Sequence, residues 1–577
     1  MSDQDLELRG LPVGHLPVIR ACLELLGVRD VLEQRLPKHP LAKVSDGECV
    51  MAMVLNILSG RVALWRMDEH LKLTDVELLI GEGVEPKHFH DTRLGQALDR
   101  LDAEGTDSLL SEIVLRYLKT TDSEPFSAHL DTTSLSLEGA YIDAPEPTPK
   151  HGFSKDLRPD LKQLIFGLLL HGRLGVPLTM SVSSGNTSDQ AANRDHLTRL
   201  AALLPNPADV TIVADCKLVD ATTLGMLTGA GFHFVSLLPD SFALRTELID
   251  RAWAAVPDPS AWPLLAERPG ATKTAAPQRY TGMSFNGDIA MRIGDVDGAK
   301  SSVERMRCLV VRSDRLAAKF EASLEDKLKR EQVRLESDLQ RAIAKEFACE
   351  TDARAAAAPL MRRLKLLSAE VGVKVMTRTP KRPQRGRPAA DAPPVEPITT
   401  WVPEVMFRRN EAAIDEARRH ASCFVLVTDW ACDEWDDQRV LAEYRYQALV
   451  EGHTGFRWLK GPAAVTPMFL NTPTRIRALG FVFMLALMVR NFIQFTLRAA
   501  MKERQRGIKH PFRKADDAKL TMEMALVWFA PMVSTFMRRP GGEWRRGPPT
   551  FQPEALDILS LLGIGAHIYS TPPPRGK

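Results

Sequence analysis

The sequence predicts an α/β protein in which a sheet covered by helices follows a helical N-terminal region. Between residues 126 and 238 strand-like segments alternate with helical ones, as in a layered α/β fold. Strand-like alternation then resumes at residues 422–430, after a long stretch of different character. A chain of 577 residues exceeds what one hydrophobic core usually organises, so we expect two or three domains.

The first 122 residues are predicted to form a small all-helical domain. Apolar side chains recur at helical spacing between residues 16 and 26. Ser45 and Glu48 fit a capping box at the start of a second apolar helix, which Gly60 would end.

The first part of the predicted core covers residues 123–242. It begins with three strands, an alternating one at 126–139, a continuous apolar one at 161–172 and a second alternating one at 177–186. A helix at 189–204, a short apolar strand at 210–215, a second helix and a final strand at 231–238 follow. This order predicts a sheet covered by helices.

Residues 243–420 are interpreted as an insertion domain. Within it, residues 314–350 alternate in charge at helical spacing, which indicates an exposed helix. Residues 378–394 are rich in Pro, Arg and Gly, as in a linker.

The core is predicted to continue over residues 421–505. A helical pattern at residues 437–459 and a long apolar helix at residues 474–501 follow the strand. Residues 506–577 are predicted to be a helical tail rich in Pro and Gly.

Composition narrows the classes of protein. The seven cysteines form no CxxC pair, which argues for a reducing cytoplasm and against structural zinc. The N-terminus, MSDQDLELRG, has no apolar signal region, and the most apolar run, residues 481–489, is too short to span a bilayer. We therefore expect a cytoplasmic protein without a membrane segment.

Charge is distributed unevenly along the chain, although the net charge is only +2. The segment TRTPKRPQRGRP, residues 377–388, holds five Arg or Lys and no acid. Residues 498–514 and 538–546 are also basic. Local patches of this kind favour a polyanionic partner, although a basic stretch rich in Pro is also typical of a soluble linker.

Three acids stand out as candidates for chemistry. Asp131 lies inside the first strand, where Asp is uncommon, and Asp215 ends the fourth strand, where α/β sheets often place functional groups. Glu451 lies far downstream on a predicted helix. Each acid taken alone could equally be a solvated or capping residue.

Convergence of the three acids would require a cation, because like charges at close range raise each other's pKa. Oxygen ligands suit Mg²⁺ or Mn²⁺. Two such ions would activate a water and stabilise a leaving oxygen in phosphodiester cleavage.

Other polar clusters leave two interpretations open. The motif KHFHD contains His88, His90 and Asp91, which suit a capping cluster better than a metal site because no fourth ligand is near. His129, two residues before Asp131, could line the active site or be a packed core histidine. The charged stretch 155–162 could be a solvated turn or could shape the site.

Several motifs resemble those of DDE transposases of bacterial insertion sequences, in the large IS-four superfamily. The longest is HGFSKDLRPDLKQLIFGLLLHGRLGVPLTMSVSSGNTSD, residues 151–189. The resemblance continues in LDTTSLSLEGAY around Asp131, IVADCKLVD around Asp215, FVLVTD at 424–429 and YRYQALVE at 444–451. Together with the N-terminal helical region, it covers nearly the whole chain.

The resemblance implies an RNase H-like catalytic core, a mixed sheet flanked by helices and interrupted by an insertion domain. It implies that Asp131, Asp215 and Glu451 hold two Mg²⁺ or Mn²⁺ ions. The expected activity is cut-and-paste transposition, in which double-stranded DNA is cleaved at the terminal inverted repeats of the element and joined to target DNA, by a protein that is a homodimer on DNA. The resemblance also implies DNA contacts for residues near the last acid: Tyr444, Arg445, His453, Arg457 and Lys460.

The chain departs from the family pattern at the third acid. Relatives have two residues between the acid and Phe-Arg, whereas FRWLK here begins five residues after Glu451. Counting back from FRWLK places His453 at the acid position, and helix geometry aligns His453, not Glu451, with Lys460. Gly452 and Gly455 could absorb the extra residues, and imidazole is a poor ligand for Mg²⁺, which favours Glu451.

Two alternative functions stay open on sequence grounds. One is a catalytically inactive, DNA-binding descendant of a transposase, which the displaced Glu451 makes conceivable. The other is a cellular metal-dependent DNA nuclease with the same core. The N-terminal helices could hold a helix-turn-helix that binds the element ends or could be a plain bundle.

Overall fold

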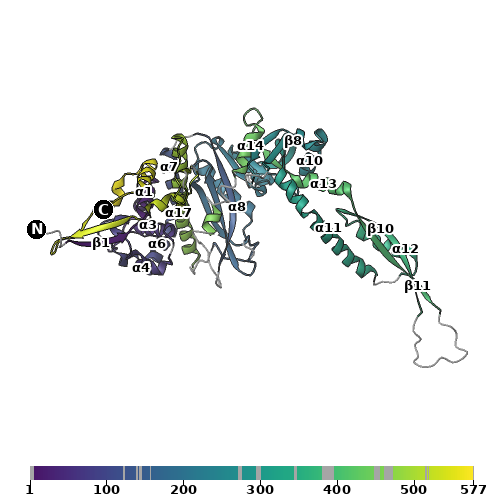
Figure 1. The fold of residues 1–577 in the computed structure, drawn as a ribbon, viewed down its shortest axis with the longest axis horizontal. Coiled ribbons are helices and arrows are strands. Elements are labelled where there is room, and N and C mark those ends of the chain that lie inside the picture. The colour runs from purple at the N-terminus through teal and green to yellow at the C-terminus, as the bar shows by residue number, and fades with distance from the viewer. Residues whose placement is uncertain are drawn as a thin grey trace, which may run out of the picture.

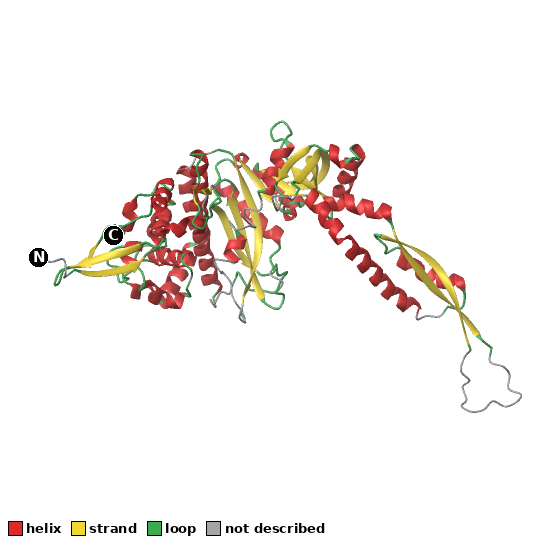
Figure 2. Ribbon diagram, viewed as in Figure 1, coloured by secondary structure: helices red, strands yellow, loops and turns green. Residues whose placement is uncertain are grey.

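A central sheet organises the molecule, and helices cover both of its faces (Figure 2). The computed structural model describes residues 6–60, 62–120, 124–137, 141, 146–155, 158–270, 276–293, 300–343, 347–379, 396–446, 455–460, 472–513, 516–517 and 519–575. Over these residues the sheet has nine strands in the order β4-β3-β2-β5-β6-β12-β9-β8-β7. The strands are β2 (Phe126–Leu137), β3 (Lys162–His171), β4 (Pro177–Ser184), β5 (Val210–Ala214), β6 (His233–Leu237), β7 (Leu264–Arg268), β8 (Gln278–Ile293), β9 (Lys300–Ser313) and β12 (Cys423–Thr428).

The first five strands have the predicted RNase H-like arrangement. Strands β2, β3 and β4 pair antiparallel in chain order, β5 pairs parallel with β2, and β6 pairs parallel with β5. The apolar run KQLIFGLLLH becomes β3, whose side chains are buried on both faces because helices cover the sheet on each side. The predicted α/β fold class is confirmed.

The two faces of the sheet are covered by different helices. One face carries α8 (Asp189–Leu203), α9 (Ala221–Ala230) and α10 (Ala243–Ala255). The other carries α14 (Asp437–Arg445), α16 (Phe456–Lys460) and α17 (Pro473–Glu503). On this second face, Gly480 of α17 packs against the ring of Phe166 in β3 so closely that a Cβ at this glycine would lie 3.0 Å from it.

Helix α17 connects the sheet to the N-terminal helices (Figure 1). By length and composition it could cross a membrane, but 89% of its most apolar window is buried inside the protein, as expected for a core helix. Its first turns are fixed to α6 by ion pairs from Arg475 to Asp99 and from Arg477 to Asp102, with shortest distances of 2.6 Å.

The N-terminal helices begin and end at local sequence signals. The predicted capping box is present, since the Ser45 hydroxyl accepts from the Glu48 N–H at 3.0 Å and Glu48 accepts from the Ser45 N–H at 2.7 Å. The helices of this region are α1 (Leu16–Leu25), α2 (Val28–Arg35), α3 (Asp46–Leu58), α4 (Met67–Leu71), α5 (Val76–Leu79), α6 (Asp91–Glu104) and α7 (Thr106–Thr120).

Two predictions about the ends of the chain are wrong. The N-terminal domain is not entirely helical, because β1 (Glu7–Pro12) forms a small sheet with β15 (Val533–Arg538), which also pairs with β16 (Arg545–Arg546). The C-terminal segment is therefore no separate tail. Its remaining elements are β13 (Ile508–Lys509), β14 (Asp516–Asp517), α18 (Met522–Leu526) and α19 (Pro553–Leu561).

Polar contacts fix this C-terminal segment to the N-terminal helices. Arg546 donates to both oxygens of the buried Asp75 at 3.0 Å, and the Tyr569 hydroxyl donates to the Gly14 carbonyl at 2.7 Å. Both ends of the chain therefore lie on the same side of the molecule (Figure 1).

The predicted insertion domain is only partly an insertion. Residues 264–313 contain β7, β8 and β9, and these strands extend the central sheet because β9 pairs with β12 along Cys423–Thr428. The sequence showed strand-like pieces here, but it did not show which strand they join.

The rest of the predicted insertion forms an arm that projects from the body (Figures 1 and 2). Its elements are α11 (Asp314–Ile343), α12 (Glu350–Met361), β10 (Leu367–Arg378), β11 (Ile398–Arg409) and α13 (Glu411–Ser422). Strands β10 and β11 form an antiparallel ribbon in which Arg378 pairs with Ile398. The predicted linker at 378–394 therefore connects two strands of one ribbon and not two domains; residues 380–395 lie outside the described residues.

Candidate active site

Asp131 and Asp215 occupy neighbouring positions of two parallel strands. In the register of β2 and β5, Leu130 is the partner of Ala214; Asp131 is the next residue within β2, and Asp215 directly follows the end of β5. Paired strands lie about 4.8 Å apart, and both acids are half-buried. The structure thus brings these two predicted site residues together.

The carboxylate of Asp215 is held at the end of β5. It accepts a hydrogen bond from the Lys217 N–H at 2.9 Å, while the Ser236 hydroxyl donates to the Asp215 carbonyl at 2.7 Å. Burial raises the pKa of Asp215 above its ordinary value, and the Lys217 hydrogen bond and the charge of Lys155 offset this only in part. Additional positive charge beside Asp215 would favour its ionised form.

A second polar cluster adjoins the two acids. The Lys155 ammonium donates to the Thr132 carbonyl at 2.6 Å and lies 3.6 Å from an oxygen of Asp189, to which the Thr132 hydroxyl donates at 2.6 Å. Asp189 raises the pKa of Asp215 and Lys155 lowers it, so all three charges share one electrostatic neighbourhood. Asp189 was not among the predicted site residues, although it ends the quoted segment 151–189.

Helix α8, which begins with Asp189, is fixed to the sheet by a buried histidine. The His196 Nδ1 lies 2.6 Å from the Thr179 hydroxyl and its Nε2 lies 2.9 Å from the Ser181 hydroxyl. Burial lowers the pKa of His196 to about 3. The imidazole is therefore neutral at physiological pH.

Lowering the pH should reduce the stability of the folded protein, and part of that loss should depend on His196. An unfolded chain takes up a proton at this histidine below its ordinary pKa of 6.5, whereas the folded protein does so only near pH 3. Between those values the group lowers the free energy of unfolding by up to about 1.4 kcal/mol per pH unit as the pH falls. In urea unfolding at pH 7 and pH 5, we expect His196→Gln to lose less stability on acidification than the wild type. Equal losses in the two proteins would contradict this expectation, and His171 titrates identically in both.

Helix α14 contacts β2 beside Asp131. The His129 Nε2 lies 3.0 Å from the Ser127 hydroxyl and 3.2 Å from Oε1 of Glu443 on α14. Burial alone would raise the pKa of Glu443, but the hydrogen bonds with His129 and Ser127 bring the pKa below its ordinary value. His129 is fully buried and shares a strand face with Asp131, so it is a packed histidine at the edge of the site.

Helix α16 contacts the same strand on the other side of Asp131. Thr133 and Leu135 of β2 line a cavity of about 10 Å³ together with Phe456 and Leu459 of α16. Every second residue of a strand points to the same face, so residues 129, 131, 133 and 135 share one face of β2. Asp131 therefore lies between His129, which contacts α14, and Thr133, which contacts α16. Glu451 and His453 belong to the connection between these helices and lie outside the described residues.

The predicted DNA-contacting residues occupy varied positions. Tyr444 packs with its ring centroid 6.3 Å from that of Phe424, and the Arg445 guanidinium lies 4.4 Å from the Tyr280 ring centroid. Arg457 is exposed and Lys460 is half-buried on α16. Their contact with DNA stays a prediction.

The histidines of KHFHD serve as caps. His88 Nδ1 accepts from the Glu85 N–H at 3.1 Å, and His90 Nδ1 accepts from the Arg93 N–H at 3.3 Å at the start of α6. Within the described ranges, no group of three His, Cys, Asp or Glu side chains is placed to hold a metal ion. The predicted triad cannot appear among them, because Glu451 is not described.

The N-terminal region of the chain matches a known family model. Residues 10–115 match a family model described as a domain of unknown function, DUF4277. No curated protein matches the chain. Among solved structures, the chain is similar to a cryo-EM structure of the piggyBac transposase synaptic complex with hairpin DNA, with 8% identity and a TM-score of 0.36 over 90% of this chain and 83% of that chain. A TM-score of this size does not establish a common fold.

Proposed function

We propose that this protein is a transposase that cleaves and joins DNA at the ends of an insertion sequence, with Asp131, Asp215 and Glu451 as its catalytic acids. The observation that carries the proposal is the adjacency of Asp131 and Asp215 on parallel strands of an RNase H-like sheet. The motifs around these acids, which resemble those of DDE transposases in the IS-four superfamily, support the same function.

The donor set suits hard divalent cations. Asp131 and Asp215 offer carboxylate oxygens, which Mg²⁺ and Mn²⁺ prefer, and burial makes the charge of Asp215 costly without a nearby cation. When bound, two such ions would supply activation of the attacking hydroxyl and neutralise charge on the leaving oxygen. The protein's part is to fix the two carboxylates, one within β2 and the other directly after β5.

Glu451 is proposed as the third acid because of where its neighbours lie. The chain leaves α14 beside His129 and resumes in α16 beside Thr133, on either side of Asp131. The ten residues between these helices, 446–455, include both Glu451 and His453, and carboxylate is the better ligand for Mg²⁺. The homodimer on DNA and the cytoplasmic location belong to the same proposal.

The proposal is tested by incubating the purified full chain with a DNA duplex that carries the sequences flanking its gene. We expect cleavage at the paired terminal repeats with Mg²⁺ or Mn²⁺, followed by joining to a target plasmid, and no cleavage in EDTA. Cleavage without preference for the repeats, and without joining, would indicate a cellular nuclease instead. Binding to the repeats without cleavage in either metal would indicate an inactive descendant.

A further inference from the structure

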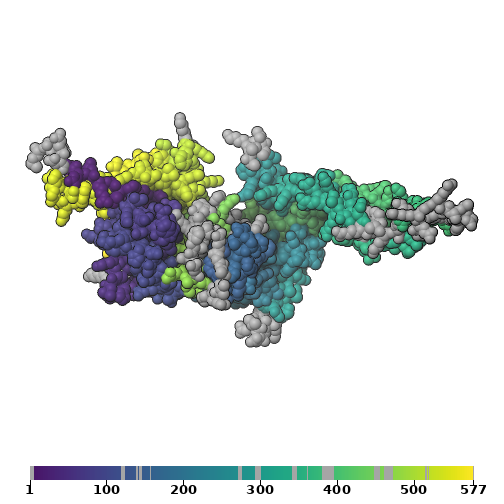
Figure 3. Space-filling model, turned by 90° about the horizontal axis from the view of Figure 1, so that it is seen from below, coloured from purple at the N-terminus to yellow at the C-terminus, as the bar shows by residue number. Residues whose placement is uncertain are grey.

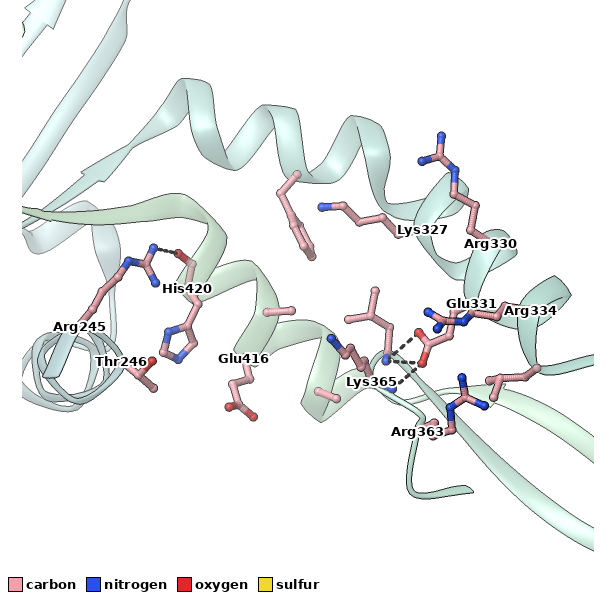
Figure 4. A pocket seen from close by; sticks show the side chains of 15 residues that line it. Arg245, Thr246, Lys327, Arg330, Glu331, Arg334, Arg363, Lys365, Glu416 and His420 are labelled. Carbon is pink, nitrogen blue, oxygen red and sulfur yellow. Dashed lines mark hydrogen bonds between the residues drawn. The ribbon is translucent and has the colours of Figure 1, made fainter. Parts of the chain in front are cut away.

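The arm carries a groove that the proposed active site does not use. The groove has a volume of about 1090 Å³ and lies where α10, α11 and α13 meet the turn that precedes β10 (Figure 4). Seen in the space-filling view, the arm extends away from the rest of the protein (Figure 3). None of the described residues that line the groove belongs to the proposed catalytic site.

Positively charged side chains dominate the lining. Figure 4 shows several of them along α11 and others from the turn before β10. The only acids in the described lining are Glu331 and Glu416. The cations are Arg245, Lys327, Arg330, Arg334, Arg363 and Lys365.

Two of these cations form ion pairs with acids of the protein, and one of the acids accepts backbone hydrogen bonds. Arg245 pairs with Asp240 at 2.9 Å, and Arg363 pairs with Asp338 at 2.6 Å. The carboxylate of Glu331 accepts hydrogen bonds from the backbone N–H groups of Lys365 and Leu366, so it serves to close the turn.

Four cations keep their charge available. Within the described part of the chain, no ion pair or hydrogen bond is formed by the side chains of Arg330, Arg334 and Lys365. The Lys327 ammonium lies 4.3 Å from the Phe320 ring centroid. Glu331 and Glu416 are the two acids of the described lining that can offset the repulsion among these cations. Such a groove favours an anionic ligand.

The spacing of these cations indicates the length of that ligand. Lys327, Arg330 and Arg334 are three and four residues apart, so they lie along one side of α11 over roughly 10 Å. That distance is too long for one phosphate group and suits successive phosphates of a chain. The described lining contains no Asn or Gln, and Lys and Arg side chains without neighbouring amides suit backbone contact better than base recognition.

From this geometry we propose that the arm groove binds the sugar-phosphate backbone of duplex DNA, independently of sequence, as a second contact remote from the catalytic acids. The proposal rests on the proposed function for the choice of DNA as the polyanion. It gives the arm a role in holding DNA while the strand ends are processed elsewhere on the protein.

The test is DNA binding by the full chain in EDTA, where no metal-dependent cleavage can occur. Fluorescence anisotropy of a labelled duplex of arbitrary sequence is measured between about 50 and 200 mM salt for the wild type and for Lys327→Gln/Arg330→Gln/Arg334→Gln. We expect the triple variant to bind at least about tenfold more weakly at low salt. Its slope of log affinity against log salt should be shallower by about 3, one for each lost phosphate contact.

A single substitution elsewhere on the same helix serves as the control for loss of charge outside the groove. Lys319 is exposed on the same helix but does not line the groove, so Lys319→Gln should retain wild-type binding. An unchanged affinity and salt slope in the triple variant, an equal loss in Lys319→Gln, or the absence of any DNA binding by the wild type would each overturn the proposal. So would RNA or polyglutamate that displaces DNA from the groove at lower concentration than unlabelled duplex does.

The two proposals can fail separately. If DNA binding depends on the groove but the wild type never cleaves DNA with Mg²⁺ or Mn²⁺, the groove stands and the catalytic function fails. If cleavage depends on Asp215 but binding ignores the triple substitution, the catalytic function stands and the groove proposal is wrong.

Discussion

Replacing either Asp131 or Asp215 by asparagine should lower the rate of metal-dependent DNA cleavage by roughly a thousandfold or more. Each substitution removes a negative charge from one of two adjacent positions, Asp131 within β2 or Asp215 just after β5, while keeping the size of the side chain and one acceptor oxygen. The measurement is single-turnover cleavage of a labelled duplex carrying the gene's own flanking ends, in Mg²⁺ and again in Mn²⁺.

Asp220 provides a matched control for this loss. It follows Asp215 by five residues and caps α9 by accepting from the Thr222 and Thr223 N–H groups, each at 3.0 Å. Asparagine also caps helices well, so Asp220→Asn should cleave at nearly the wild-type rate. Cleavage that survives in Asp131→Asn or Asp215→Asn would show that these acids do not hold the catalytic metals.

The second large effect concerns the third acid. Glu451→Gln should abolish excision of a marker flanked by the gene's own ends in cells, whereas His453→Ala should leave excision within about tenfold of the wild type. The reason is that a carboxylate binds Mg²⁺ well and an imidazole binds it poorly. Excision frequency is scored beside Asp215→Asn as the inactive reference.

If His453 and not Glu451 were required for excision, the third catalytic position would lie two residues further along the chain. Loss of excision in His453→Ala alone would place the critical position at 453, in agreement with the count back from FRWLK. No excision even by the wild type, together with retained binding to the ends, would favour the inactive descendant.

The strands of the core could be predicted because their signals are local. Residues 126–137 alternate and residues 162–171 are continuously apolar, and each pattern depends only on which sheet face is buried. The positions of Asp131 inside a strand and of Asp215 at a strand end were visible for the same reason. Their adjacency was not visible, since it depends on the parallel register of β2 with β5.

Pairings between distant segments escaped prediction. Strand β1 is six residues long and has no stability without β15, and β9 joins the sheet only through β12, more than a hundred residues later. Nothing in the sequence of β1 or β9 indicates which strand it pairs with. The sequence therefore showed strand-like pieces in the insertion and missed that they extend the central sheet.

Part of the site was also missed because it consists of contacts between elements. Asp189 is an ordinary first residue of a helix until Thr132 and Lys155 are placed beside it, and Glu443 becomes notable only when α14 meets His129. The choice between Glu451 and His453 stays open for another reason. Two counts along the sequence disagree, and the connection lies outside the described residues.

The pairing of β1 with β15 can form only late in the synthesis of the chain. Glu7 of β1 and Arg538 of β15 are 531 residues apart. After the ribosome has synthesised β1, it therefore needs roughly 30 to 100 s to synthesise β15. Throughout that interval the N-terminal helices have left the ribosome with one edge uncovered. A nascent chain is thus exposed to proteases and chaperones at its N-terminal end until translation is nearly complete.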